Sequence, residues 1–344
     1  MKIILDAMGS DNAPDAQIAG SVQAVKEFDD IEIVLVGQSE IINAELDKYD
    51  YPKHAISVVH APDVITNNDE PAKAVRTKKE SSMVVGATML KNDEGDAFVS
   101  MGNTGALLAS ALLIVGRIKG VLRPALAPVI PTSSGVAMLI DAGANADCKS
   151  ANLVQFAIMG SVYMKKVLGY ESPSVGLVNI GAEEKKGNEL TREAHQLLKQ
   201  QTNVNFYGNV EGSDIVAGKA DIVVCDGFAG NLVLKVIEGM GGYINKTFKG
   251  IFFKNIKTKF AAVLVKDGLK NFKKTMDYRE YGGSPFLGIK KPVIKAHGSS
   301  DARAVYSTVK QVRKIILTDV IGTIQTELEK TDLESAKTKH DSDK

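Results

Sequence analysis

Short apolar runs alternate with amphipathic segments along most of this chain. The runs are rich in Val and Ile, which is typical of strands buried on both faces in a parallel sheet. The segments between them repeat apolar residues at helical spacing. This pattern predicts strands at Lys2–Ala7, Glu32–Val36, Ile56–His60, Ala97–Met101, Val175–Ile180, Asn205–Tyr207, Ile222–Cys225 and Val293–Ala296. It predicts helices at Asp15–Phe28, Glu40–Lys48, Pro71–Lys91 with a break, Ala106–Ile118, Ala151–Leu168, Asn188–Gln200, Ala229–Glu238 and Ala302–Leu328.

The middle of the chain departs from this alternation. Leu126–Ile130 and Val136–Ile140 are apolar runs joined by a turn-forming Pro-Thr-Ser-Ser-Gly segment, which predicts an antiparallel hairpin. We therefore expect a doubly wound three-layer α/β/α sandwich whose sheet is mostly parallel and contains this hairpin. A single α/β domain should span residues 1–329, and residues 330–344, mostly charged or small, should form a flexible tail.

Residues 239–281 form a basic and aromatic insert. Four apolar residues fall four apart on one helical face: Phe248, Phe252, Ile256 and Phe260. Gly268 is expected to turn the insert into a second helix. A basic amphipathic helix suits a membrane interface or an acidic partner, and the same face also suits contact between subunits, which we place first. The residues expected to dock a carrier protein or membrane are Lys246, Lys249, Lys254, Lys257, Lys259, Phe252 and Phe260.

Charge and cysteine content narrow the classes of function. The 42 basic and 41 acidic residues nearly cancel, which excludes the global basic field of a nucleic-acid-binding protein. Only Cys148 and Cys225 could pair, and Cys225 lies in an apolar strand, so a reducing cytoplasm is expected. Met1–Asp6 reads as a strand rather than a signal peptide, and no apolar run approaches about 18 residues. We expect a cytoplasmic protein that at most associates peripherally with the membrane surface.

Six Gly-containing turns follow predicted strands. In a parallel sheet such turns gather at one edge and form a ligand-binding crevice, although each one alone is also an ordinary turn or helix cap. Glycine-rich turns and helix starts present N–H groups to anions. The sequence therefore predicts an anion-binding crevice built from residues 6–11, 102–105, 141–145, 179–188, 226–231 and 297–300.

The turn after strand Ile222–Cys225 is the strongest candidate for chemistry. Asp226 and Asn231 should face the crevice, as should Lys235 if its helix turns that way. Further positive charge is available from Lys185, Lys186 and Arg192 elsewhere in the chain. His297 is the one histidine at a strand end beside Gly and Ser, where a capping role is an equal alternative.

Several established motifs are missing from the sequence. It has no G-x-x-x-x-G-K-[ST] loop and no G-x-G-x-x-G after the first strand, which counts against a P-loop kinase or a standard dinucleotide site. No Cys/His cluster has zinc spacing, and Cys225 is better placed for packing than for nucleophilic attack. We expect no cofactor and no metal.

Taken together, these turns resemble the bacterial acyl-carrier-protein:phosphate acyltransferases of phospholipid synthesis, the PlsX family. Ser10 stands where the pattern leads us to expect a second glycine, and Ala182 where we expect an acidic residue. The matching segments run in order through nearly the whole chain: DAMGSDNAP at 6–14, EPAKAVRTKKESSM at 70–83, VSMGNTGA at 99–106, DAGAN at 141–145, 179–189, GNVEGSDIVAG at 208–218, 226–235, GGSPFLG at 282–288 and AHGSSDA at 296–302.

The resemblance implies a fold similar to phosphotransacetylases and isocitrate-dehydrogenase-like enzymes. It also implies a homodimer that converts acyl–acyl carrier protein and inorganic phosphate into acyl phosphate. A membrane glycerol-3-phosphate acyltransferase would then consume the product, and the enzyme would associate peripherally with the inner face of the bacterial membrane.

The same resemblance suggests roles for the residues of the turns. Phosphate attacks a thioester and a thiolate leaves, so the site has to hold phosphate and stabilise an oxyanion, with little need for acid–base help. Lys185 or Lys186 is expected to hold phosphate, Asn231 and His297 to polarise the carbonyl or protonate sulfur, and Asp226 to orient a neighbour. The residues expected to bind phosphate or substrate are Asp6, Gly9, Asn103, Thr104, Gly105, Lys186, Asn188, Gly230, Lys235 and Ser299.

Other functions fit parts of the pattern. A phosphotransacetylase acting on acyl-CoA would use the same fold and nucleophile, although the long apolar insert favours a long-chain substrate. A non-catalytic membrane scaffold for lipid synthesis is a second alternative, which the polar turns disfavour. A metal-dependent dehydrogenase of the related fold is the weakest, because the dinucleotide fingerprint is missing.

Overall fold

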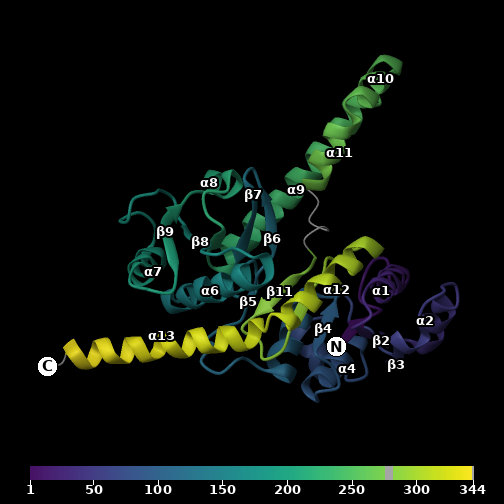
Figure 1. The fold of residues 1–344 in the computed structure, drawn as a ribbon, viewed down its shortest axis with the longest axis horizontal. Coiled ribbons are helices and arrows are strands. Elements are labelled where there is room, and N and C mark those ends of the chain that lie inside the picture. The colour runs from purple at the N-terminus through teal and green to yellow at the C-terminus, as the bar shows by residue number, and fades with distance from the viewer. Residues whose placement is uncertain (276–281, 343–344) are drawn as a thin grey trace.

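Two separate sheets form the framework of the chain in the computed structural model, which describes residues 1–275 and 282–342 (Figure 1). The first sheet has seven strands in the order β3-β2-β1-β4-β12-β11-β5, of which β3 to β12 run parallel. The last two strands, β11 and β5, pair antiparallel. The bounds are β1 Lys2–Asp6, β2 Glu32–Gly37, β3 Ile56–His60, β4 Ala97–Ser100, β5 Ala125–Leu126, β11 Ser284–Leu287 and β12 Val293–Lys295.

The second sheet has five strands in the order β6-β7-β10-β8-β9. It contains the predicted hairpin, since β6 and β7 pair antiparallel, and its other strands run parallel. The expectation of a single sheet was wrong, because the run Leu126–Ile130 is the crossing between two sheets. Pro128, which has no N–H to donate, separates β5 from β6. The bounds are β6 Val129–Thr132, β7 Gly135–Ile140, β8 Ser174–Val178, β9 Asn205–Val210 and β10 Ile222–Val224.

Helices cover both faces of the sheets, so the predicted α/β/α fold class is confirmed. The short helix α8 and strand β11 were not predicted, and Asp319, with a φ of 47°, separates α12 from α13 where one helix was expected. The helices are α1 Asp15–Glu27, α2 Ser39–Leu46, α3 Pro71–Thr77, α4 Ser82–Lys91, α5 Thr104–Ser110, α6 Ser150–Tyr163, α7 Glu189–Lys199, α8 Gly212–Ala217, α9 Gly227–Phe252, α10 Ile256–Leu264, α11 Lys266–Thr275, α12 Ala302–Leu317 and α13 Val320–Ser342.

The core is divided by the sheets into two apolar clusters. Along β1, Ile3 and Leu5 belong to one cluster and Ile4 to the other, as the alternation of side chains in a strand requires. Helices α1 and α12 pack together over the first face, and α4 covers the second. Each fully buried aliphatic side chain contributes about 1.5–3 kcal/mol to folding. This packing fixes the strand ends that carry the turns.

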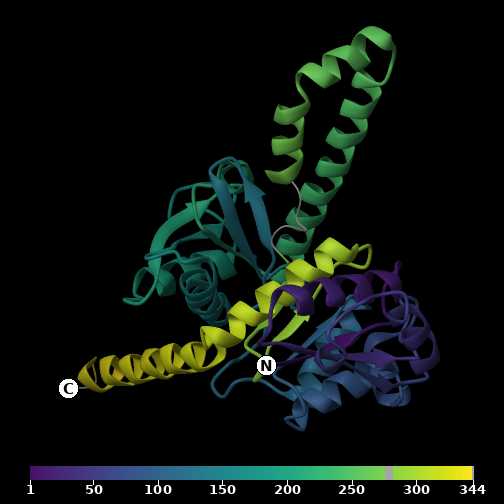
Figure 2. The same cartoon turned by 45° about the vertical axis from the view of Figure 1, so that its right-hand side comes forward.

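A helical arm projects from the body of the protein (Figure 2). It consists of the second half of α9 together with α10 and α11, and the ring of Phe248 lies 5.7 Å from that of Phe272 across the arm. The predicted boundary at Gly239 was wrong, because α9 runs unbroken from Gly227 to Phe252. The chain turns at Asn255, which caps α10, rather than at Gly268. Residues 276–281 of the predicted insert lie outside the described residues.

Helix α13 continues past residue 330 to Ser342, over the stretch where a tail was expected. None of the helices within the described residues is long and apolar enough to cross a bilayer.

Candidate active site

A cavity of about 1130 Å³ lies where the carboxyl ends of strands from the two sheets face each other. The first sheet contributes Lys295 and His297, from the end of β12 and the turn after it. The second sheet contributes Gly143 and Asn231, from the turn after β7 and the start of α9. The cavity thus has one wall from each sheet and opens toward the arm.

His297 presents one defined ring nitrogen to the cavity wall. The backbone N–H of Ser299 donates to its Nδ1 over 3.2 Å, and the Ser299 hydroxyl lies 2.8 Å from the same atom. Because Nδ1 accepts from the backbone, the neutral ring carries its proton on Nε2. Partial burial lowers the pKa of His297 below its usual 6.5. At neutral pH the ring is therefore a neutral hydrogen-bond donor.

Lys295 is a buried cation at the end of β12. Its side chain belongs to a residue that is 9% exposed, and Nζ donates to the carbonyl oxygens of Met101, at 3.2 Å, and Ala296. Burial lowers the pKa of Lys295 to about 8, against the opposing charge of Asp6. The ammonium group of Lys295 therefore titrates near pH 8, within the pH range in which many enzymes work.

The wall from the second sheet is organised by Asp141. Its carboxylate accepts hydrogen bonds from the backbone N–H groups of Leu126, Gly143, Ala144 and Asn145 at 2.7–3.2 Å, and from the Asn145 amide. These bonds hold the 141–145 turn in one shape. Desolvation nevertheless raises the pKa of the buried Asp141.

Helix α9 begins directly against this turn. Asp226 caps the helix, since its Oδ1 accepts from the N–H of Ala229 at 2.8 Å. Two glycines permit the contact: a Cβ at Gly227 would lie 2.5 Å from the Asn145 oxygen, and one at Gly230 only 1.9 Å from the Asp141 oxygen. Asp226 and Gly230 therefore shape the wall instead of presenting groups to a ligand.

Asn231, one residue further, lies on the cavity wall. A Cβ built on Gly143 would approach its Oδ1 to 3.5 Å, so the bare glycine leaves room for the amide. One turn later, Lys235 also lines the cavity and pairs with Glu238 at 2.7 Å. The predicted residues on the cavity wall are Asn231, His297, Thr104, Gly105, Lys235, Ser299, Lys249 and Phe252.

Many apolar side chains also line the cavity. Leu108 and Leu126 line it from the body, and Ile237 lines it from α9. The aromatic rings of the arm continue this lining, which suits a hydrocarbon chain more than a polar ligand. The aromatic side chains concerned are Phe248, Phe252, Phe253 and Phe272.

Three predicted residues lie behind the wall formed by the first sheet. Asp6 is 1% exposed and accepts from the Ser100 hydroxyl at 2.7 Å. Gly9 packs so closely that a Cβ would lie 2.8 Å from Asp6 and 2.9 Å from Gly102. Asn103 caps α5 and donates its amide to the carbonyl of Thr66. All three support the turns that border the cavity.

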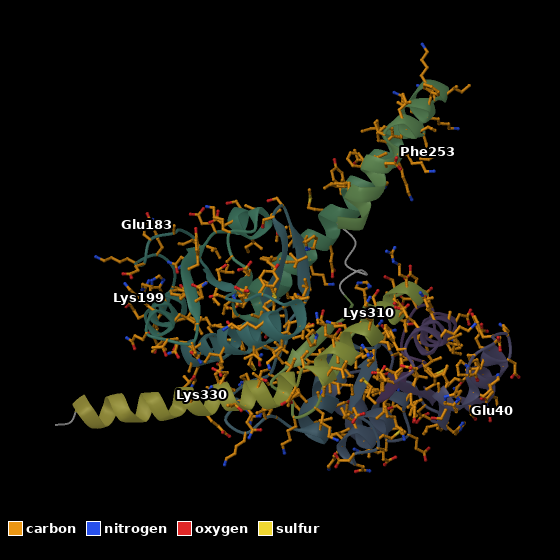
Figure 3. All side chains as sticks on the ribbon, viewed as in Figure 1. Glu40, Glu183, Lys199, Phe253, Lys310 and Lys330 are labelled. Atoms are coloured by element: carbon orange, nitrogen blue, oxygen red, sulfur yellow. The ribbon has the colours of Figure 1, made fainter. Side chains whose placement is uncertain are left out.

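The turn carrying Lys185 and Lys186 lies away from the cavity. Both lysines are exposed, and Asn188 caps α7 through the N–H of Thr191. Figure 3 shows Glu183, in the same turn, at the outer edge of the half built on the second sheet. The expectation that one crevice collects all six turns was therefore wrong for this turn, and no residue of the turn at 6–11 lines the cavity either.

Ser10 and Ala182, the two departures from the family pattern, lie off the cavity wall. Ser10 accepts a hydrogen bond from the Gln17 amide at 2.6 Å, and Ala182 is exposed.

The arm carries the remaining predicted residues. Lys246, Lys254, Lys257, Lys259 and Phe260 are exposed there, interspersed with apolar side chains. Figure 3 shows Phe253 near the outer end of the arm.

The sequence reasoning missed Lys295. A signal was present, because a lone lysine between Ile294 and Ala296 interrupts a strand that is otherwise apolar. Lysine is almost never buried without a reason.

Two other kinds of chemistry find little support. Burial raises the pKa of the Cys225 thiol well above its usual value, so Cys225 is a packing residue. Within residues 1–275 and 282–342, no three His, Cys, Asp or Glu side chains are grouped so as to hold a metal ion.

Comparison with known proteins gives strong similarities over most of the chain. The family model described as fatty acid synthesis protein matches residues 1–323. A phosphate acyltransferase of Thermoanaerobacterium thermosaccharolyticum is 53% identical over 329 residues, 96% of this chain and 97% of that protein. One of Alkaliphilus oremlandii is 54% identical over 316 residues, 92% of this chain and 94% of that protein. Among solved structures, the EutD phosphotransacetylase from Staphylococcus aureus matches with a TM-score of 0.60 at 15% identity, over 91% of this chain and 94% of that chain, which shows a shared fold.

Proposed function

This chain belongs to the fatty acid synthesis protein family and is a phosphate acyltransferase, and we propose that it takes a long-chain fatty acyl group from acyl carrier protein. Its reaction moves the acyl group to phosphate in phospholipid synthesis. The observation that carries the proposal is the cavity, whose wall combines polar groups at the strand ends with many apolar and aromatic side chains.

The polar groups at the strand ends of the cavity wall are suited to attack on a thioester. A phosphate oxygen forms a bond to the carbonyl carbon, and the carbonyl oxygen becomes an oxyanion. Nε2–H of His297 and the amide of Asn231 are the proposed donors to this oxyanion, and each such donor supplies about 3–4 kcal/mol of transition-state stabilisation. The C–S bond then breaks, acyl phosphate leaves, and the carrier thiolate takes a proton from solvent or from a neighbouring donor.

The size and the apolar lining of the cavity are suited to the acyl chain. A volume of about 1130 Å³ lies slightly above the range of roughly 300–1,000 Å³ that is usual for small-molecule sites. The aromatic lining from the arm extends this space beyond the reacting atoms. Both features favour a long chain over an acetyl group.

The arm is the proposed docking surface for the carrier protein and the membrane. Large apolar side chains are exposed there, including Ile256 at 85% and Leu264 at 73%. Lysines surround them, and this combination suits an anionic lipid surface or an acidic protein. The enzyme would then work in the cytoplasm at the inner face of the membrane, where a glycerol-3-phosphate acyltransferase consumes acyl phosphate.

A homodimer is proposed from an exposed stripe on α9 that runs from Phe228 to Tyr243. Phe228, Leu232, Val236, Met240 and Tyr243 are exposed, by 49–71%, and recur at helical spacing. A contiguous apolar stripe of this kind marks an interaction surface. A second copy of the chain would cover it.

The proposal is tested by supplying long-chain acyl–acyl carrier protein and inorganic phosphate and trapping acyl phosphate with hydroxylamine. Product that requires both substrates, and that falls about 100-fold with Asn231→Ala, is the expected result. Asn205→Ala, on the exposed edge strand β9, serves as the matched control and should retain full turnover.

Two other results would overturn the proposal. Product only from acyl-CoA would make the enzyme a phosphotransacetylase. Lipid binding without product from either thioester would make the chain a membrane scaffold.

A further inference from the structure

We propose that Lys295 holds the attacking phosphate in the cavity. The inference rests on the proposed function for the identity of the anion, and it adds a residue that the sequence did not suggest. Its basis is the position of a buried ammonium on the cavity wall, two residues from His297.

The pairing of β12 with β4 fixes the position of Lys295 at the end of its strand. Lys295 on β12 pairs with Ser100 on β4, and the Ser100 hydroxyl donates to Asp6 at the end of β1. Three adjacent parallel strands therefore end in a row of lysine, serine and aspartate. The row lies at the carboxyl edge of the sheet, where α/β proteins bind their ligands.

One donor of the ammonium remains for a ligand. Lys295 has three N–H donors, and the carbonyl oxygens of Met101 and Ala296 take two of them. Among the residues that the structure describes, no protein acceptor is found for the third. A buried, charged donor without an acceptor is costly, and an anion in the cavity relieves that cost.

The other lysines on the cavity wall are less suited to this role. Lys235 is more than half exposed and already pairs with Glu238, and Lys249 and Lys266 belong to the arm. Lys295 lies instead beside the proposed oxyanion donor. Phosphate bound there would be adjacent to the thioester carbonyl that it attacks.

Charged groups face Lys295 from every element around it. Asp6 and Asp11 come from β1 and the turn after it, Lys235 and Glu238 come from α9, and His297 follows on its own strand. The nearby carboxylates raise the pKa of Lys295, but burial lowers it by more and keeps it near 8. A bound dianion should return that pKa toward its usual value, so anion binding above pH 8 should take up a proton.

Sulfate is the probe for the first test, because it stays dianionic over the whole range and adds no titration of its own. Calorimetry on the full-length protein at pH 8.5, in two buffers of different ionisation enthalpy, gives both affinity and proton uptake. Wild type is expected to bind sulfate with uptake of most of one proton. Lys295→Met should bind about 10- to 100-fold more weakly and take up none.

Two further variants separate charge from structure. Lys295→Arg keeps a charge that does not titrate in this range, so it should bind sulfate without proton uptake. Lys310→Met, on the exposed side of α12, should behave like wild type. Sulfate binding to wild type without proton uptake would overturn the inference even if Lys295→Met failed to fold, and so would uptake that persists in a folded Lys295→Met.

Turnover separates this inference from the proposed function. With acyl–acyl carrier protein as donor, Lys295→Met should raise the KM for phosphate about 10- to 100-fold and leave the KM for the thioester unchanged. An unchanged phosphate KM would refute the role of Lys295 and leave the acyl donor intact. Proton-linked sulfate binding without any acyl phosphate product would support the site and refute the proposed donor.

Discussion

At the scale of single residues, the site depends on which hydrogen-bonding groups are already used. His297 accepts through Nδ1 within its own turn, and Asp226 accepts through its carboxylate to cap α9, so both groups take part in shaping the turns that carry them. The side-chain amide of Asn103 is likewise used within the fold. Its oxygen caps α5, and its nitrogen donates to the carbonyl oxygens of Thr66 and Asp69. A residue at a strand end can act on a ligand only through hydrogen-bonding groups that its own turn or helix cap does not already use.

The role of His297 predicts a specific pH dependence. Burial lowers its pKa below 6.5, so the ring is neutral at neutral pH. Protonation leaves Nε2–H in place but puts a second proton on Nδ1, which then cannot accept from the Ser299 N–H. The ring should therefore lose its fixed orientation as the pH falls through the lowered pKa. His297→Ala should reduce kcat about 100-fold at pH 7.5. The ratio of wild-type to variant rates should be constant above pH 6.5 and fall below it, as measured by hydroxylamine trapping.

His54, which is exposed in a short turn of helix, provides the control for this measurement. His54→Ala should leave both the rate and its pH dependence unchanged. A rate ratio for His297→Ala that stays flat down to pH 5 would contradict the assigned role.

Two glycines of α9 predict opposite effects on stability. Gly230→Ala places a methyl group 1.9 Å from the Asp141 oxygen, so it should lower the free energy of unfolding by at least about 1–3 kcal/mol. Gly239→Ala meets nothing within 4 Å and should raise it by up to about 1 kcal/mol. Urea unfolding of both variants checks the pair, and equal effects would show that α9 does not pack as described.

At the scale of elements, the arm contributes both to the cavity and to the exposed surface. Phe248, Phe252, Lys249 and Lys266 line the cavity, whereas Lys254, Lys257 and Lys259 are exposed and do not line it. These three lysines can therefore be changed without altering the cavity wall.

Charge reversal on the arm predicts a docking defect. The triple variant Lys254→Glu, Lys257→Glu, Lys259→Glu should bind anionic vesicles at least about 10-fold more weakly, at roughly 1 kcal/mol for each lysine near the surface. Turnover of a small thioester substrate should be unaffected. Co-sedimentation with vesicles, and the KM for acyl–acyl carrier protein, distinguish the two proposed partners.

The matched control reverses three exposed lysines of the body, Lys26, Lys91 and Lys310. It changes the net charge equally and should retain vesicle binding. Equal loss in both triple variants would assign the effect to overall charge instead of the arm.

The sequence predicted most elements and missed those that depend on distant contacts. The buried strands were found from their own apolar runs, as at Ile222–Cys225. Strand β11 was missed because Ser284–Leu287 contains a proline and pairs with strands far away in the sequence. The break at Gly239 was wrong because isolated glycines are tolerated inside a helix, at a cost of about 1 kcal/mol each, and α9 continues through them.

At the scale of the whole molecule, the site is shared between two sheets. The turns after β4 and β12 face those after β7 and β10, a pairing that strand periodicity could not reveal. The sequence did identify Asn231 and His297, which lie on opposite walls, because each follows a strand and a glycine-containing turn. It missed Lys295, because the lone lysine in an apolar strand signals a buried charge but not the cavity beside it.

The exposed stripe on α9 predicts the oligomeric state. Val236→Asp should convert the proposed dimer to a monomer, since it places a charge in the middle of the apolar surface. Val216→Asp, at a valine of α8 that is similarly exposed, should leave the dimer intact. Sedimentation velocity measures both, and a wild-type chain that sediments as a monomer would refute the proposed interface.

Helix α9 also has a mechanical consequence. Its 26 residues span about 39 Å as one rod, anchored at the reaction centre by the 141–145 turn and ending at the tip of the arm. Glycines at 239, 241 and 242 lie near its midpoint, and a Cβ at any of them would meet nothing. No side chain at these three positions braces the helix where the arm leaves the body. The proposed docking lysines Lys246 and Lys249 and the proposed oxyanion donor Asn231 nevertheless belong to one continuous helix.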